Sequence, residues 1–374
     1  AVAFQGCVMD KTLVWLWLAD AVGSGCHYAS ELLALYPDPA ELYDVLRAGT
    51  EAPPPCLTPR ALAQLQDTTP FDYEERLDHC LLTGVEVLTP DEALYPDRLR
   101  DLPDLPLALY VTGNADCLNG RRYVGMVGTR RPSAYGRQAA FDLSLAMAQQ
   151  GVVLVSGMAD GLDSEAHRAA VQADEPTVAF LGTAIDKTYP ASNAKLRRAI
   201  EKSGGAVCSE YPPAYAGRTT GTFLARNRLI AAQSEALCVA EARTRSGTLN
   251  TVGHAERLGR PVLAVPGSIY SALSEGANEL LRTHRAEPLC AAADVLRLLG
   301  VGEETESPVQ QRFDPADVSA DARAVYAVLK PTPQGVDALC VLTHLPAGRV
   351  LAACTELELA GGAEAQPGRR YVAK

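Results

Sequence analysis

The spacing of apolar side chains changes character along this chain of 374 residues. Residues 1–82 are predicted to be helical, because apolar residues such as Leu13, Leu16 and Trp17 recur at helix spacing. From Val85 onward, short β-rich apolar runs alternate with segments of helical period. This alternation, with continuously apolar strands, predicts an α/β fold with a Rossmann-like parallel sheet that is covered by helices on both faces.

The same pattern predicts four successive parts. After the helical N-terminal domain at residues 1–82 comes the α/β domain at residues 83–300. Residues 301–317 are rich in glutamate and proline, which predicts an acidic linker. Residues 318–374 contain one helix, a helix-turn-helix pair and a hairpin around Gln366-Pro367-Gly368, which together predict a small winged-helix domain.

The net charge of −11 is unevenly distributed along the chain. Residues 1–117 contain 6 basic and 19 acidic side chains, whereas residues 118–300 contain 21 basic and 16 acidic ones, a net charge of +5. The basic middle region is therefore compatible with a polyanionic ligand despite the acidic whole. The 10 cysteines occur singly, which predicts buried thiols rather than a metal site, and no cofactor is expected. Without a signal peptide or a long apolar run, we expect a cytoplasmic protein.

In a parallel sheet, ligands bind beyond the carboxyl ends of the strands, so the residues after each strand are the candidates for function. The first central strand ends in Gly128-Thr129-Arg130-Arg131, where a tight turn and two arginines favour phosphate binding. The second ends in Ser156-Gly157, whose small side chains leave room for a sugar–phosphate chain. Asp163 is predicted to cap the next helix, and His167 to be a packed helix residue without a catalytic role.

The strongest single signal is Phe223 followed by Arg226-Asn227-Arg228, since an aromatic ring beside cationic side chains can stack a base and bind its phosphate. The alternative is that Phe223 belongs to the core and that Arg226 or Arg228 pairs with Glu210. Ser246-Gly247 opens another helix and offers a further anion-binding terminus.

The middle of the chain resembles the DprA/Smf family of DNA-processing proteins. The resemblance is carried, in order, by GTRRPSAYG, SGMADGLDSEAH, YPASN, SEYPP, FLARNRLIA, EARTRSGTLNT and VPGS…EGAN, over roughly residues 84–290. It implies an N-terminal domain similar to a sterile-alpha-motif fold, an extended Rossmann domain and a C-terminal winged helix. It also implies a protein, not an enzyme, that binds single-stranded DNA in natural transformation, loads the RecA recombinase and forms a homodimer through the Rossmann domain.

By this resemblance, several positions are expected to contact DNA. They are the turn residues Gly128, Thr129 and Arg130, the segment with Arg218, Phe223, Arg226 and Arg228, and also Lys187 and Lys195. Together with Arg131, Ser156, Gly157, Asn227, Ser246 and Gly247, they form the predicted interface.

Two other functions remain open. A Rossmann-like nucleotide phosphoribohydrolase would carry a P-G-G-x-G-T-x-x-E signature, but the corresponding helix start reads Arg245-Ser246-Gly247-Thr248, and Glu256 lies too far along. A sequence-specific regulator acting through the winged helix is disfavoured by the zero net charge of residues 308–374.

Overall fold

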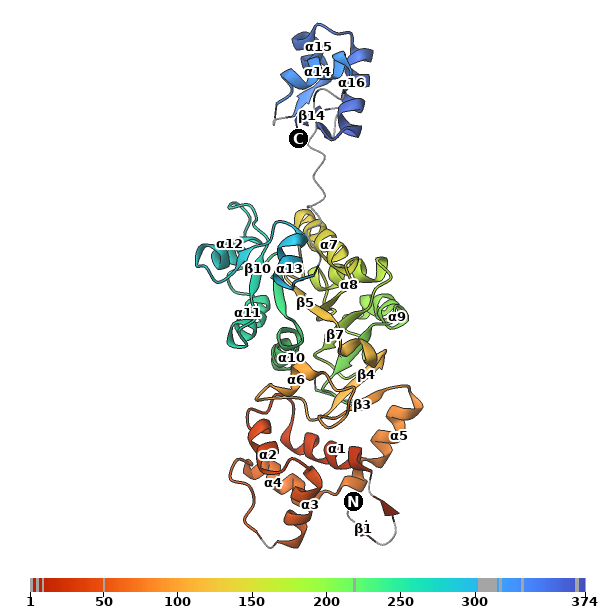
Figure 1. Ribbon diagram of the computed structural model, residues 1–374, viewed down its shortest axis with the longest axis vertical. Helices are drawn as coiled ribbons and strands as arrows, with labels where there is room; N and C mark the ends of the chain where they lie inside the picture. The colour runs from red at the N-terminus through yellow and green to blue at the C-terminus, as the bar shows by residue number, and fades with distance from the viewer. Residues whose placement is uncertain are drawn as a thin grey trace. The chain divides into compact units, whose positions relative to one another are not determined.

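The computed structural model describes residues 3–4, 7–8, 10–49, 51–217, 220–301, 315, 318–330, 333–366 and 370–373. The chain forms two compact units, Ala1–Gly302 and Glu303–Lys374 (Figure 1). The boundary predicted at residue 82 falls inside the first unit and stays a prediction. In the described part of the chain, no single helix has both the length and the apolar character to cross a bilayer. The helices α15 (Val336–Thr343) and α16 (Ala347–Leu359) have that length and apolar character only as a pair, and the pair is bent by 104°.

A nine-stranded sheet, in the order β11-β10-β9-β5-β6-β7-β8-β4-β3, forms the centre of the first unit. Its strands are β3 (Glu86–Leu88), β4 (Leu109–Gly113), β5 (Arg122–Val127), β6 (Val152–Ser156), β7 (Thr177–Leu181), β8 (Ala206–Ser209), β9 (Ala236–Val239), β10 (Val262–Ala264) and β11 (Glu287–Pro288). Seven neighbouring strands, from β11 to β8, run parallel, which confirms the predicted Rossmann-like architecture. The prediction of a wholly parallel sheet is wrong at one edge, where β4 is antiparallel to both β8 and β3.

Helices cover both faces of this sheet, because consecutive side chains of each strand point to opposite sides. Val124 and Met126 of β5 face one core, which α7 (Ala134–Ala148) and α8 (Leu162–Gln172) cover. Tyr123 and Val127 face the other core, which α10 (Thr220–Gln233) and α11 (Gly247–Arg257) cover. The helices of this region are α6 (Asp97–Arg100), α7 (Ala134–Ala148), α8 (Leu162–Gln172), α9 (Ala194–Lys202), α10 (Thr220–Gln233), α11 (Gly247–Arg257), α12 (Glu275–Arg282) and α13 (Ala292–Leu298), with the 3-10 turns η2 (Ala115–Leu118) and η3 (Ala191–Asn193).

The N-terminal segment is helical, as predicted, apart from a short antiparallel pair at its start, β1 (Ala3–Phe4) and β2 (Cys7–Val8). Its helices are α1 (Lys11–Val22), α2 (Ala29–Leu35), α3 (Pro39–Ala48), α4 (Pro59–Asp67), η1 (Pro70–Tyr73) and α5 (Glu74–Leu82). Trp15 and Trp17 of α1 are buried in a hydrophobic core that also includes residues of the sheet. The helical segment is thereby fixed to the α/β region.

The second unit has the elements of a winged helix. They are α14 (Ala320–Val328), β12 (Gln334–Gly335), α15 (Val336–Thr343), α16 (Ala347–Leu359), β13 (Ala363–Gln366) and β14 (Arg370–Ala373). The three strands form one antiparallel sheet in the order β12-β14-β13. Most of the predicted linker at 301–317 lies outside the described residues.

Candidate nucleic-acid interface

A groove of about 550 Å³ opens beyond the carboxyl ends of β5 and β9. The sheet order reverses here, since β6, β7 and β8 follow on one side of β5 while β9 and β10 lie on the other. In open α/β sheets, such a switch point is the usual place of ligand binding. The segment after β5 is held against β9 by the Thr129 amide, which donates to the Glu241 carbonyl at 2.9 Å. Gly128 and Thr129 are both in the wall of the groove.

Two aromatic rings and an arginine form one side of the groove. The Arg130 guanidinium carbon lies 5.4 Å from the centre of the Phe223 ring, and the centres of Phe223 and Tyr189 are also 5.4 Å apart. Arg130 is exposed and forms no ion pair with any described residue. Its positive charge and the half-buried Phe223 ring are therefore both presented to a ligand.

Helix α10 contributes Phe223, Arg226 and Asn227, which lie three and four residues apart and hence on one face of the helix. The Arg226 guanidinium is buried and donates to the carbonyl of Gly157, at 2.8 Å, and to that of Phe180. Burial lowers the pKa of Arg226 to about 10, partly offset by Asp163, so the side chain remains a cation at neutral pH. Gly157 has no room for a side chain, because a Cβ there would collide with this guanidinium.

Arg228 is on a different face of α10, and the structure gives no support to its predicted contact with DNA. Its guanidinium is 2% exposed and bonds both oxygens of Glu210 at 2.6 Å, with Asp104 at 2.9 Å from its Nε. Although burial alone would lower the pKa of Arg228, the Glu210 carboxylate raises it. The alternative pairing with Glu210 is thus confirmed for this arginine. The physical reason is that residues two apart on a helix point in nearly opposite directions.

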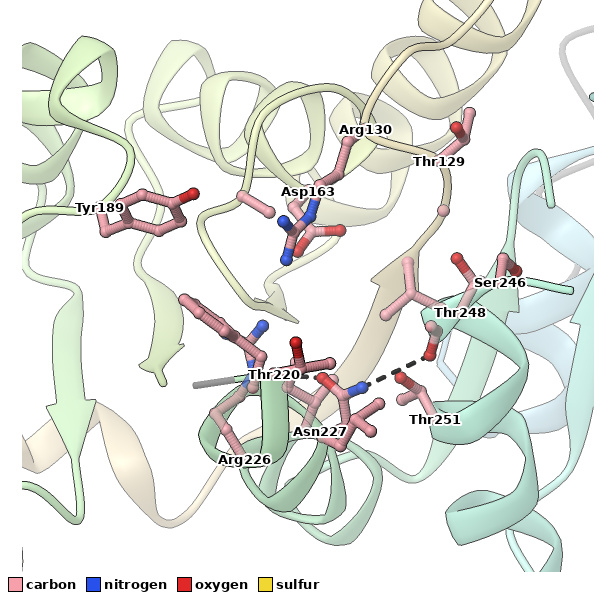
Figure 2. A pocket seen from close by; sticks show the side chains of 17 residues that line it. Thr129, Arg130, Asp163, Tyr189, Thr220, Arg226, Asn227, Ser246, Thr248 and Thr251 are labelled. Atoms are coloured by element: carbon pink, nitrogen blue, oxygen red, sulfur yellow. Dashed lines mark hydrogen bonds between the residues drawn. The ribbon is translucent and has the colours of Figure 1, made fainter. Parts of the chain in front are cut away.

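The N-terminus of α11 forms the opposite wall, with Ser246, Gly247 and Thr248 (Figure 2). The first amides of a helix lack intrahelical acceptors and carry a partial positive charge, so they favour an anion. Ser246 is the N-cap, yet its side chain makes no capping bond, and its enclosed Oγ has no partner among the described residues. Asn227 connects this wall to α10 through its amide, which donates to the Gly247 carbonyl at 3.4 Å.

Asp163 lies in the same groove but is not the N-cap that we predicted. Helix α8 begins at Leu162, and its N-cap is Gly161, at a φ of 83° that is costly for any residue with a side chain. Burial raises the pKa of Asp163, and this is opposed by the Arg226 charge and by hydrogen bonds from the backbone of Gly157 and Ala159. The groove thus holds a buried carboxyl group of raised pKa beside the cations Arg226 and Arg130.

The first turn of α7 is already occupied by a carboxylate of the protein itself. Glu241 accepts hydrogen bonds from the Ser133 amide at 3.0 Å and from Ser133 Oγ at 2.6 Å. The absence of a side chain at Gly136 makes room for this carboxylate. The first turn of α7 is therefore closed to a ligand anion, whereas no side-chain cap occupies the first turn of α11.

The other predicted residues are scattered. Ser156 is buried and donates to the Met126 carbonyl at 2.6 Å, so its hydroxyl is used internally. Arg131 and Lys195 are exposed but do not line the groove, and Lys187 donates to the Tyr215 carbonyl at 3.1 Å. Arg218 lies outside the described residues.

The prediction that His167 is a packed helix residue is confirmed. The side chain is fully buried, and Nδ1 lies 2.8 Å from Thr177 Oγ1. Burial lowers the pKa of His167 to about 3, so the ring is neutral at physiological pH.

Several residues of the groove were missed by the sequence reasoning, above all Tyr189, Thr248 and Thr251. Tyr189 could have been found, since it follows β7 at the same edge of the sheet as the residues chosen there. Thr251 had a weaker signal, one turn after Gly247 on the same helix face.

Taken together, these features define a Rossmann-like α/β protein whose switch-point groove is lined by cations, aromatic rings and a free helix terminus. A family model described as DNA recombination-mediator protein A matches residues 86–300, and a second, described as the DprA winged helix domain, matches residues 309–369. The chain belongs to the DprA/Smf family of DNA processing proteins, and the winged-helix prediction is confirmed by the second match.

Individual relatives agree with this assignment. A protein named DNA processing protein DprA in Mycobacterium tuberculosis is 36% identical over 307 residues, covering 78% of each chain. The structure of DNA processing protein A from Streptococcus pneumoniae is similar with a TM-score of 0.63 at 29% identity, covering 77% of this chain and 98% of that one. That of Helicobacter pylori, reported for its single-stranded DNA binding mode, has a TM-score of 0.52 at 30% identity, covering 57% and 95%.

Proposed function

We propose that the groove between α10, α11 and the segment after β5 binds single-stranded DNA. The observation that supports this function is the convergence of Arg130, from the segment after β5, with Phe223 and Arg226 of α10, since all three line one cavity. Arg130 offers charge to a phosphate, Phe223 offers a ring to a base, and the α11 terminus offers amides to a second phosphate. The Helicobacter pylori relative, whose reported structure concerns single-stranded DNA binding, supports the same ligand.

An unpaired strand fits this groove better than a duplex, because a base can stack on Phe223 only when it is free of its partner. The cations and the α11 terminus are suited to phosphates, and backbone contacts carry no sequence information. We therefore expect little sequence preference and an affinity that falls with increasing salt.

Fluorescence anisotropy with labelled oligonucleotides, single- and double-stranded, at two salt concentrations tests this function. Arg130→Ala and Phe223→Ala should each weaken binding, the latter by roughly 1–3 kcal/mol for one lost stacking contact. Lys202→Ala is the matched control, since Lys202 is exposed at the C-terminal end of α9 and outside the groove. Wild-type affinity in both groove variants and in their double variant would refute the assignment.

The resemblance to the family leads us to propose two partners as well. These are the RecA recombinase, which the chain would load onto protected single-stranded DNA in natural transformation or recombination, and a second copy bound through the Rossmann domain. RecA filament assembly on DNA coated with single-strand-binding protein measures the first, and sedimentation velocity the second. No stimulation of assembly, or a monomer at all concentrations, would contradict the respective proposal.

The phosphoribohydrolase alternative gains no support from the geometry. Glu256, the acid closest to the signature of those enzymes, pairs with Arg285 at 2.8 Å and does not line the groove. Incubation with nucleoside monophosphates, followed by chromatography for released base, tests this alternative directly.

A further inference from the structure

The segment after β10 exposes two large apolar side chains next to each other. Tyr270 is 94% exposed and Ile269 is 82% exposed, the two most exposed large hydrophobic residues of the α/β region. Single exposed apolar residues are common on protein surfaces. This pair, however, lies at the carboxyl edge of the sheet, where the proposed DNA groove also opens.

Hydrogen bonds fix this segment beside the walls of the groove. Tyr135, in the first turn of α7, donates its hydroxyl to the Pro266 carbonyl at 2.7 Å. At the other end, the Gly276 amide donates to the Ala242 carbonyl at 2.7 Å, and Gly276 packs closely on Arg243. The segment that presents Tyr270 is thus anchored both to the residues after Arg131 and to those that lead into Ser246.

The surface next to this segment is cationic. Arg243 and Arg245 are exposed, and neither forms an ion pair with any residue that the structure describes. Residues 265–274 contain no acidic side chain, and Glu275 follows at the start of α12. An exposed ring on a segment that packs against a stretch with two unpaired arginines has the composition of a base-stacking site on a phosphate track.

The two aromatic sites are too far apart for one nucleotide. Phe223 packs on Gly182 at the end of β7, whereas Tyr270 follows β10, four strands along the sheet order. At about 4.8 Å for each strand, the separation is roughly 19 Å. Since stacked nucleotides rise by about 3.4 Å each, the two rings would hold bases several nucleotides apart.

We propose that the single-stranded DNA track extends from the groove across Arg243 and Arg245 to Tyr270, which stacks on a second base. This inference rests on the proposed function of the groove and adds a second subsite to it. Each arginine neutralises one phosphate between the two stacked bases. Oligonucleotides long enough to span both rings bind more tightly than those that fill the groove alone.

Photocrosslinking with an oligonucleotide that carries 5-iododeoxyuridine distinguishes the two subsites. Trypsin releases Phe223 in the peptide 219–226 and Tyr270 in the peptide 258–282, and each of these residues is the only aromatic one in its peptide. With the wild-type chain, adducts are expected in both peptides. Tyr270→Ala should lose the adduct in 258–282 and keep the one in 219–226, whereas Tyr270→Phe should keep both.

Anisotropy titrations give the corresponding affinities. Tyr270→Ala should weaken binding of a long oligonucleotide by about 5- to 10-fold and leave binding of one of about 4 nucleotides unchanged. The double variant Arg243→Ala/Arg245→Ala should reduce the slope of log affinity against log salt by about 0.7 for each lost contact. Lys202→Ala, at the opposite edge of the sheet, should leave the slope unchanged.

The possible failures are distinguishable. An adduct in 219–226 alone, with wild-type affinity of Tyr270→Ala at every length, would overturn the extension and leave the groove assignment intact. Absence of single-stranded DNA binding by the wild-type chain would overturn both. Loss of self-association in Tyr270→Ala, with unchanged DNA binding, would overturn the extension and mark Tyr270 as a protein contact.

Discussion

Replacing Arg228 tests whether this arginine stabilises the fold and has no part in DNA binding, in contrast to Arg130 and Arg226, which line the groove. Arg228→Met removes the guanidinium that binds both oxygens of Glu210. The Glu210 side chain is only 3% exposed, so the substitution leaves a buried carboxylate without its cation. Asp104, the other acidic partner, is 25% exposed and regains water more easily. Removing one partner of a buried ion pair typically costs about 3–5 kcal/mol. Since Ser24 Oγ still donates to Glu210 at 2.8 Å, the lower end of this range is expected.

Urea unfolding followed by tryptophan fluorescence measures this loss. The two tryptophans of the chain, Trp15 and Trp17, are both buried in α1, so the signal reports the first compact unit and not the winged helix. Arg228→Met should lower the unfolding free energy by about 3 kcal/mol. Arg130→Ala, an exposed and unpaired position, should change it by at most about 0.5 kcal/mol while weakening DNA binding.

A third variant tests the cause of the instability. Adding Glu210→Met to Arg228→Met removes the buried carboxylate that has lost its partner. The double variant should therefore recover most of the lost unfolding free energy. The reasoning fails if Arg228→Met is as stable as the wild type and yet loses DNA affinity. Arg228 would then act in the groove and not in the core.

Three further outcomes are expected. Gly157→Ala should displace the Arg226 guanidinium from its two carbonyl partners, which lowers the unfolding free energy by about 1–3 kcal/mol and weakens DNA binding; an unchanged urea midpoint would contradict the close contact. Gly136→Ala should push the Glu241 carboxylate away from α7 and destabilise the first unit by about 1–3 kcal/mol, as measured by the same unfolding curves. A bound phosphate raises the already elevated pKa of Asp163 further. Binding therefore takes up a proton, and affinity should rise as the pH is lowered. Asp163→Asn should abolish this dependence, and an equal pH response in the variant would exclude Asp163 as its source.

The alternation of strands and helices could be predicted from the sequence because it depends on the local periodicity of apolar residues. The apolar pattern predicts strands at residues 177–181 and 206–209 and a helix at residues 194–202, and β7, β8 and α9 have these bounds. The strands were predictable because a strand buried on both faces is apolar at every position. Two elements were not predicted from the apolar pattern. Strand β11 has only two residues, which are too few to form a pattern, and the antiparallel direction of β4 depends on how its connections run in space.

The candidate site was predictable where helix geometry alone decides it. Phe223, Arg226 and Asn227 share a face of α10 because three- and four-residue spacings bring side chains together. The same rule predicts from the sequence alone that Arg226 and Arg228, two residues apart, lie on different faces of α10.

The remaining features depend on residues that are far apart in the chain. Which carboxylate pairs with Arg228, which anion faces the first turn of α7, and which ring lies against Arg130 are set by Glu210, Glu241 and Phe223 across the sheet. The sequence by itself determined the class of fold and the family, because both follow from patterns along the chain. Only the tertiary structure decided which cations are free for a ligand, because a charge is neutralised by its neighbours in space and not by its neighbours in sequence.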